Sequence, residues 1–154
     1  MSSPLEQQKR RGRLIRYAPL ILWIGVIFVL SSNAGSASNT SMIIRPLVLL
    51  LFPNISEDGL QTVHFFVRKT AHVTEYGILG LLALRAFKGS AIGFVRNWRY
   101  IFAVLLAMLV AVCDEYNQSF LASRTGKPED ALLDAAGATV FLVICYRLGR
   151  IFSR

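Results

Sequence analysis

Charged and titratable side chains occur inside apolar stretches of this sequence, where a membrane would penalise each of them unless it is paired. A helix over residues 63–87 would carry four such groups on one face, since successive residues are rotated by about 100°. Two further apolar runs, 100–113 and 135–146, each have acidic residues at one end. The groups are His64, Arg68, His72 and Glu75, with Lys69 and Tyr76 on the adjacent stripe, then Asp114, Glu115 and Gln118, and then Asp130 and Asp134.

These groups are expected to meet at one level of a helical bundle, because the helices over 63–87 and 135–146 start on the side where the helix over 100–113 ends. Arg68 and Lys69 would pair there with Asp114, Glu115 and Asp134, either in a buried ion network or in a pocket for a polar headgroup or lipid-linked sugar. The catalytic candidates are His72, Glu75, Asp114 and Glu115. The binding candidates are Arg68, Lys69, His72, Tyr76, Asp114, Glu115, Gln118, Arg124, Asp130 and Asp134.

The residue types in this cluster limit its chemistry and its ligands. His72 is suited to act as a general base, a proton relay or a hydrogen-bond donor, but no nucleophile stands at a matching spacing. Oxygen and imidazole donors suit a metal, yet Arg68 and Lys69 would repel it, so we expect no metal site and no cofactor. The carboxylates outnumber the two cations, so either burial protonates one or two of them or the pocket prefers cationic or neutral-sugar groups. A strongly anionic phosphate is the less natural ligand.

The composition indicates a membrane protein. The 154 residues have a mean hydropathy of +0.49 and are 54% hydrophobic but only 17% charged, whereas soluble domains carry about 25% charged residues. These values exclude intrinsic disorder, and the presence of only two cysteines excludes a disulfide scaffold. Cys113 and Cys145 fall at different depths of their helices, so we expect no disulfide between them.

An all-α fold with four membrane-spanning helices is predicted, the first helix covering residues 17–32. If both termini are cytoplasmic, most of the 17 basic residues lie on the cytoplasmic side of the membrane. Of the nine acidic residues, only Glu6 lies on that side. This distribution is the one that the positive-inside bias requires. The net charge of +8 therefore reflects topology, and we reject nucleic-acid binding. A cleaved signal peptide is the alternative for the first run, because basic residues precede it.

The connection after the first run contains an apolar segment, residues 42–53, that is too short to span a membrane. Arg45-Pro46 interrupts it, and we expect an external interfacial or re-entrant segment. The domain assignment is a basic cytoplasmic tail over 1–16, one four-helix membrane domain over 17–150 and a basic cytoplasmic end over 151–154. Ala131, Ala135 and Thr139 predict a small-residue stripe along the fourth helix.

Four sequence blocks are distinctive in their order and spacing: WIGVIFVLSS at 23–32, RKTAHVTEYGILG at 68–80, DEYNQSF at 114–120, and Arg124 followed by Asp130 and by DAAG at 134–137. Together they resemble the VanZ-like family of small integral membrane proteins. The second block resembles the family's Lys-x-x-His-x-x-x-Tyr signature and the third its Asp-Glu-x-x-Gln block. The chain departs from the family at 122–124, where Ala-Ser-Arg replaces the common Pro-Gly-Arg, so the shape of this external turn is expected to differ.

The resemblance implies a multi-pass protein of the plasma membrane, surrounded by lipids, rather than a particular reaction. The founding member is associated with low-level resistance to the glycopeptide teicoplanin, and some relatives are named phosphotransbutyrylases. This sequence has no phosphate-cradling glycine loop that would support such an activity, and it leaves open whether a reaction is catalysed. We expect the pocket to bind or modify a cell-envelope component. The alternative is a small proton-coupled transporter or assembly partner acting as a homo-oligomer.

Overall fold

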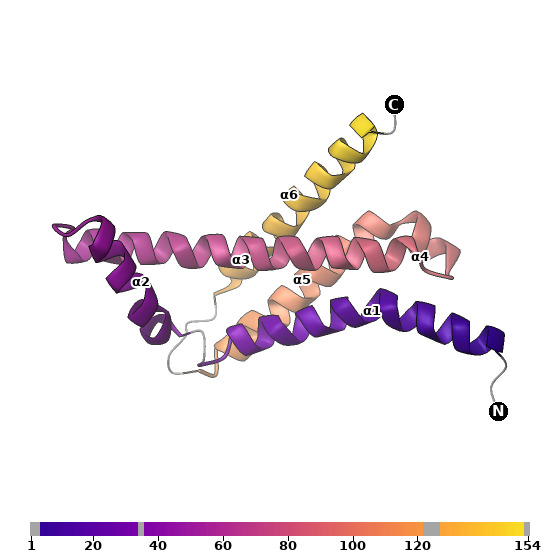
Figure 1. Ribbon diagram of the computed structural model, residues 1–154, viewed down its shortest axis with the longest axis horizontal. Coiled ribbons are helices and arrows are strands. Elements are labelled where there is room, and N and C mark those ends of the chain that lie inside the picture. The colour runs from indigo at the N-terminus through magenta and orange to yellow at the C-terminus, as the bar shows by residue number, and fades with distance from the viewer. Residues whose placement is uncertain (1–3, 34–35, 122–126, 153–154) are drawn as a thin grey trace.

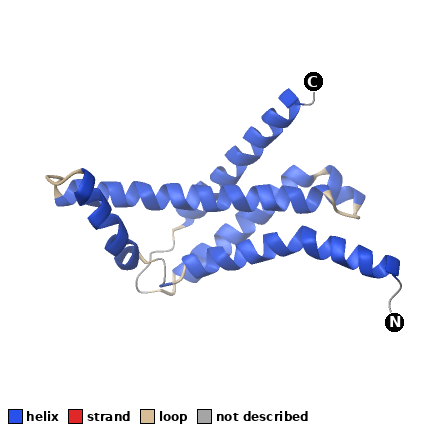
Figure 2. Ribbon diagram, viewed as in Figure 1, coloured by secondary structure: helices blue, strands red, loops and turns tan. Residues whose placement is uncertain are grey.

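The computed structural model describes residues 4–33, 36–121 and 127–152, which form helices and, within these ranges, no strand (Figures 1 and 2). The predicted all-α class is therefore confirmed. The helices are α1 (Pro4–Leu30), α2 (Ala37–Leu51), α3 (Glu57–Lys88), α4 (Gly93–Asn97), α5 (Arg99–Gln118) and α6 (Pro128–Phe152).

Three stretches of the described helices are long and apolar enough to cross a membrane. They are Glu6–Leu30 in α1, Arg99–Gln118 in α5 and Pro128–Gly149 in α6. With 32 residues, α3 is about 48 Å long at 1.5 Å per residue, which exceeds the hydrocarbon thickness of about 30 Å. Its composition, not its length, excludes it from this set, because charged residues occupy its middle. The chain is therefore a membrane protein by composition, and α3 as a fourth span remains a prediction.

The long helix α3, which carries charged residues in its middle, is the central one. It contacts α1, α2, α4, α5 and α6, and Figure 1 shows it running across the whole structure. Protein neighbours bury mainly the second half of α3, which contains all but one of its buried residues. This arrangement explains how a helix with buried polar groups fits among apolar ones.

The ends of α3 follow from its local sequence. The Ser56 side chain caps the first turn by accepting the Gly59 amide proton at 3.2 Å. Two acidic residues in the first turn and two basic residues in the last turn complement the helix dipole. These signals extend α3 beyond the predicted apolar run of 63–87 at its beginning.

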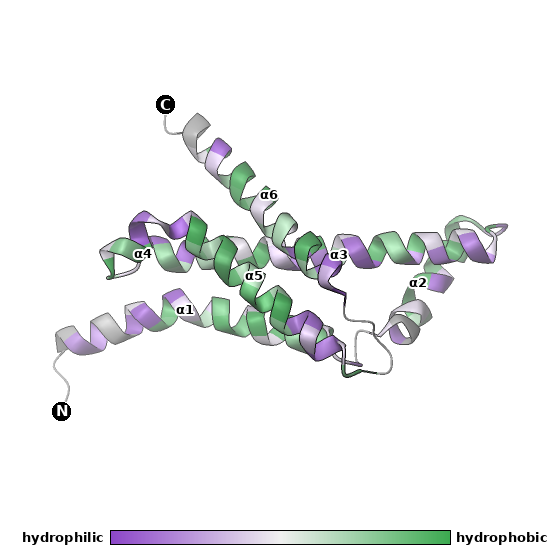
Figure 3. Ribbon diagram, turned by 180° about the vertical axis from the view of Figure 1, so that it is seen from behind, coloured by the Kyte–Doolittle hydropathy of each residue, from purple (hydrophilic) through white to green (hydrophobic). Residues whose placement is uncertain are grey.

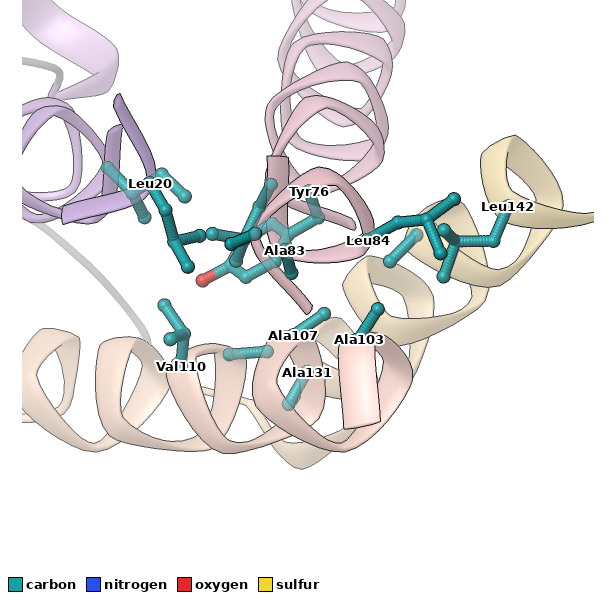
Figure 4. Packing of buried hydrophobic residues seen from close by; sticks show 14 residues of the cluster. Leu20, Tyr76, Ala83, Leu84, Ala103, Ala107, Val110, Ala131 and Leu142 are labelled. Carbon is teal, nitrogen blue, oxygen red and sulfur yellow. The ribbon is translucent and has the colours of Figure 1, made fainter. Parts of the chain in front are cut away.

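The core consists mostly of small and aliphatic residues from four helices. Leu20 of α1, Tyr76 of α3, Val110 of α5 and Leu142 of α6 belong to one buried cluster (Figure 4). Alanines at the contacts between helices allow their backbones to approach closely. Large apolar side chains such as Leu109 are exposed, as expected for residues that face lipid.

The structure corrects three details of the sequence predictions. The first helix begins at Pro4, so most of the segment predicted as a basic tail is helical. Helix α2 continues through Pro46, which does not interrupt it. Thr139 is exposed, whereas Ala131 and Ala135 are buried, so the predicted stripe is only partly a packing surface. Apolar periodicity alone reveals neither polar helix ends nor the exact face of a short stripe.

Helix α2 packs beside the beginning of α3 and exposes an apolar surface. Arg45 binds Glu57 of α3 through two hydrogen bonds of 3.0 and 2.6 Å. Met42 and Leu50 are 70% and 77% exposed. Fifteen residues are too few to span a bilayer, which agrees with the expectation of an interfacial or re-entrant segment.

The two termini and α4 lie towards the same end of the bundle in Figure 1. The end of α1, the end of α5 and the beginning of α6 lie away from this end. Figure 3 shows hydrophilic residues at the end of α5 and at the beginning of α6. Hydrophilic residues also colour the first half of α1 and the region of α4, so both ends of the bundle carry polar residues.

Candidate functional site

The candidate site depends on the close contact between α3 and α6. A Cβ atom built on Gly137 of α6 would lie 2.9 Å from the carbonyl oxygen of Val73, and one on Gly77 of α3 would lie 2.6 Å from the ring of Phe141. Only glycine fits such separations without a shift of the backbone or the ring. The two helices thus approach closely just beyond His72 and Asp134 in the direction of both chains.

Two polar pairs link α3 to α6 at this contact. Lys69 forms a salt bridge with Asp130, and one turn further the Nδ1 atom of His72 lies 3.4 Å from Oδ2 of Asp134. Because the partners advance by three residues on α3 and four on α6, both pairs lie on the facing sides of the two helices.

The observed partner of Lys69 differs from the predicted one. We expected Lys69 and Arg68 to pair with Asp114, Glu115 or Asp134, but the lysine binds Asp130. Sequence spacing predicts the face of a helix on which a residue lies, but it does not predict how far one helix is shifted along another. Asp130 and Asp134 are one helical turn apart, so a shift of one turn exchanges one for the other as the partner of Lys69.

Asp114 connects α5 to α1 and α3. Its Oδ2 atom accepts hydrogen bonds from Ser31 Oγ at 2.7 Å, from Gln118 Nε2 at 2.9 Å and from the Tyr76 hydroxyl at 3.4 Å. Asp114 and Tyr76 are both 0% exposed. Within the described part of the chain the hydrogen-bond donors to this carboxylate are all neutral, and they link it to three helices in the interior.

Glu115, the neighbouring carboxylate, faces α6 and the chain that leads into it. Its Oε2 atom accepts the backbone N–H of Lys127 at 2.8 Å, and the residue is 6% exposed. One potential ligand atom each of Glu115, His72 and Asp134 lies within 4.8 Å of the others. Three helices thus bring an imidazole and two carboxylates to one place.

Three buried polar atoms on α3, α5 and α6 have no hydrogen-bond partner among the described residues. They are Nη1 of Arg68, Oδ1 of Asp114 and Oδ1 of Asp134. Arg68 forms no salt bridge within the described ranges, so its predicted pairing with a carboxylate is wrong for this part of the chain. Buried polar groups normally have partners, and unsatisfied ones in a native structure are candidate positions for a ligand or ion.

A groove of about 480 Å³ between α5 and α6 leads to the cluster. Its apolar wall includes Met108, Val112 and Leu132, and its polar end includes Glu115 and Lys127. Glu115 therefore belongs both to the groove and to the buried cluster. The groove has the amphipathic character of a site for a molecule with one apolar and one polar part.

The structure brings most of the predicted binding residues together but separates others. Glu75 accepts a hydrogen bond from Trp23 Nε1 through its backbone carbonyl at 2.9 Å, so this contact does not involve its predicted catalytic carboxyl group. His64 contacts Thr40 of α2 at 3.2 Å instead of joining the cluster. Arg124 and the Ala-Ser-Arg departure lie outside the described residues. The residues brought together are Lys69, His72, Tyr76, Asp114, Glu115, Gln118, Asp130 and Asp134.

Ser31 belongs to the site, although its type and position gave no reason to select it. A serine at the end of an apolar helix is common, and its link to Asp114 appears only once α1 is placed beside α5. The signal that could have found it is the block at 23–32, which contains both Ser31 and Trp23.

Comparison with known families agrees with this arrangement. The model of the VanZ/LLP1 family matches residues 17–152, which include every residue of the described cluster. This chain belongs to the VanZ/LLP1 family. The VanZ resemblance seen in the four sequence blocks is therefore confirmed over nearly the whole chain. No curated protein and no solved structure matches the chain, so the family itself supplies the only comparison for the VanZ site described above.

Proposed function

We propose that this VanZ-family protein binds an amphiphilic component of the cell envelope, with the apolar part in the groove between α5 and α6 and the polar part at Glu115. The observation that carries the proposal is that one groove has an apolar wall and ends at a buried acidic cluster. A purely structural bundle would not need buried carboxylates, because apolar residues of similar size are often equally stabilising.

The charges of the site favour a cationic or hydroxyl-rich headgroup. Lys69 is already paired with Asp130, while Asp114, Glu115 and Asp134 are bound by neutral donors or by His72. A lipid headgroup, a lipid-linked sugar or a glycopeptide offers hydroxyl or ammonium donors to these carboxylates. If the ligand is a lipid-linked wall precursor, the protein would alter susceptibility to glycopeptide antibiotics. The proposal includes no reaction.

We further propose four spans, with α3 as the second and both termini in the cytoplasm of a cell with this protein in its plasma membrane. Basic residues near the termini and around α4 support this orientation through the positive-inside bias. The location of both termini and α4 towards one end of the bundle also supports it. The acidic cluster would then lie near the outer membrane surface.

Cysteine labelling in intact cells tests the topology. In a Cys113→Ser/Cys145→Ser background, Asn54→Cys is expected to react with an impermeant thiol reagent, whereas Ala91→Cys is expected to react only after the cells are opened. Both positions are exposed, so burial does not protect either. Labelling of Ala91→Cys alone in intact cells would show that the orientation is the opposite of the proposed one. Labelling of both variants would show that α3 does not cross the membrane.

Mass spectrometry of molecules that remain bound to the purified protein tests the ligand. Val112→Trp should fill the groove and reduce the retained amphiphile about tenfold, equivalent to about 1.4 kcal/mol of binding free energy. Val140→Trp is the matched control, because both valines are 53% exposed and Val140 lies outside this groove. Equal retention in the two variants would contradict the groove as the binding site. Absence of any retained amphiphile, together with proton-coupled flux in liposomes, would favour the transporter alternative.

A further inference from the structure

The cluster of His72, Glu115 and Asp134 has the donor atoms of a metal site. A nitrogen and two carboxylate oxygens, one from each of α3, α5 and α6, lie within 4.8 Å of one another. Ligand atoms around a tetrahedral zinc ion lie about 2.0–2.2 Å from the metal and therefore about 3.4 Å from each other. Small side-chain rotations would close the remaining distance without movement of the helices.

A second observation, independent of this spacing, points to a missing partner. Asp134 is 1% exposed, and its Oδ1 atom has no hydrogen-bond partner within residues 4–33, 36–121 and 127–152. The adjacent Asp114 is 0% exposed and also has one unpartnered oxygen. Buried carboxylates without compensating charge are costly, and a divalent cation would supply that charge.

The structure also changes the electrostatic argument against a metal. From the sequence, Lys69 and Arg68 were expected to occupy the cluster and repel a cation. Instead, Lys69 is bound to Asp130, and Arg68 forms no salt bridge with a described carboxylate. The three carboxylates Asp114, Glu115 and Asp134 are therefore not neutralised by a lysine or arginine of the described chain.

We propose that His72, Glu115 and Asp134 bind one divalent transition-metal cation of the zinc class. The imidazole nitrogen favours such an ion over Mg²⁺ or Ca²⁺, which prefer ligand sets made of oxygen alone. Three protein ligands would leave a fourth position for water or for an oxygen of a bound molecule. The Lys127 amide bound to Oε2 of Glu115 orients this carboxylate, as partners of metal ligands commonly do.

The metal site depends on the cluster alone and does not require an amphiphile in the groove. The test therefore uses detergent-purified full-length protein that has been stripped with EDTA and then titrated with Zn²⁺ alone. Stoichiometry is measured by elemental analysis, and affinity by calorimetry. We expect one Zn²⁺ per chain, with affinity reduced by at least about tenfold in Asp134→Asn and in His72→Gln.

Glu129→Gln is the matched control, because Glu129 is an exposed carboxylate on the same helix as Asp134, and it should bind Zn²⁺ as the unmodified chain does. X-ray absorption should show nitrogen and oxygen ligands, whereas sulfur ligands would place the ion at Cys113 or Cys145 and overturn the proposal. Undiminished binding in the folded variants, or no stoichiometric Zn²⁺ in the unmodified chain, would also overturn it. Amphiphile retention is measured on the same EDTA-treated protein. This second measurement shows whether the proposed metal site or the proposed amphiphile-binding groove is the one that is wrong.

Discussion

Replacing Gly137 with alanine is expected to lower the free energy of unfolding by about 1–3 kcal/mol, the usual cost of forcing extra atoms into a packed contact. The new Cβ would lie 2.9 Å from the carbonyl oxygen and 3.1 Å from the Cα of Val73. Backbone atoms cannot rotate away as a flexible side chain can, so α3 and α6 would have to separate. That separation would also pull His72 away from Asp134.

Gly149→Ala is the control for this substitution, because no atom lies within 4 Å of a Cβ built at Gly149 in the same helix. Its helix propensity should improve, so it should match or exceed the unmodified protein in stability. Thermal and denaturant unfolding in detergent provide the comparison. If Gly137→Ala were as stable as Gly149→Ala, the close contact between α3 and α6 would be wrong.

Lys69→Met and Asp130→Asn are each expected to reduce stability by about 2 kcal/mol, between the values typical of exposed and of buried ion pairs. The two side chains are 27% and 29% exposed, which places the pair between these limits. Each single change leaves one charge without its partner. The double variant should therefore lose less stability than the sum of the two single losses.

Lys69→Met combined with Glu115→Gln provides the contrasting pair, since Lys69 binds Asp130 in the structure. The stability loss of this double variant should be closer to the sum of the two single losses. Strong coupling of Lys69 to Glu115, with none to Asp130, would restore the pairing expected from the sequence and contradict the observed one. Retained amphiphile measured on the Lys69/Asp130 set shows whether the salt bridge also matters for binding. If the double variant regains stability but does not regain amphiphile retention, the pair belongs to the binding site. If it regains both stability and amphiphile retention, the pair has a structural role.

The sequence predicted the helices and the membership of the polar cluster better than its internal contacts. Apolar runs located α5 and α6, and the rotation of residues along a helix placed His72 and Asp134 on facing sides. The partner of Lys69 could not be predicted, because it depends on how far α6 slides along α3. That register is determined by the glycine contacts at Gly137 and Gly77, which a single sequence does not reveal.

Other differences arise because polar residues extend helices beyond their apolar runs. The beginning of α1 at Pro4 and the course of α2 through Pro46 are examples. Ser31 became part of the site only through tertiary contact with Asp114. Family membership required several short blocks in order, and it was the most secure inference from the sequence because it did not depend on the helix register.

The central position of α3 has a consequence for biogenesis. In the proposed four-span arrangement, α3 emerges from the ribosome before its polar partners on α6, since Asp130, which pairs with Lys69, and Asp134, which contacts His72, both follow it in the chain. Lysine and arginine near the middle of a helix each oppose membrane insertion by about 3 kcal/mol. Helix α3 must therefore stay beside the insertion machinery or at the membrane surface until α6 has been synthesised. The last helix to be translated thus completes the membrane insertion of α3, the second span.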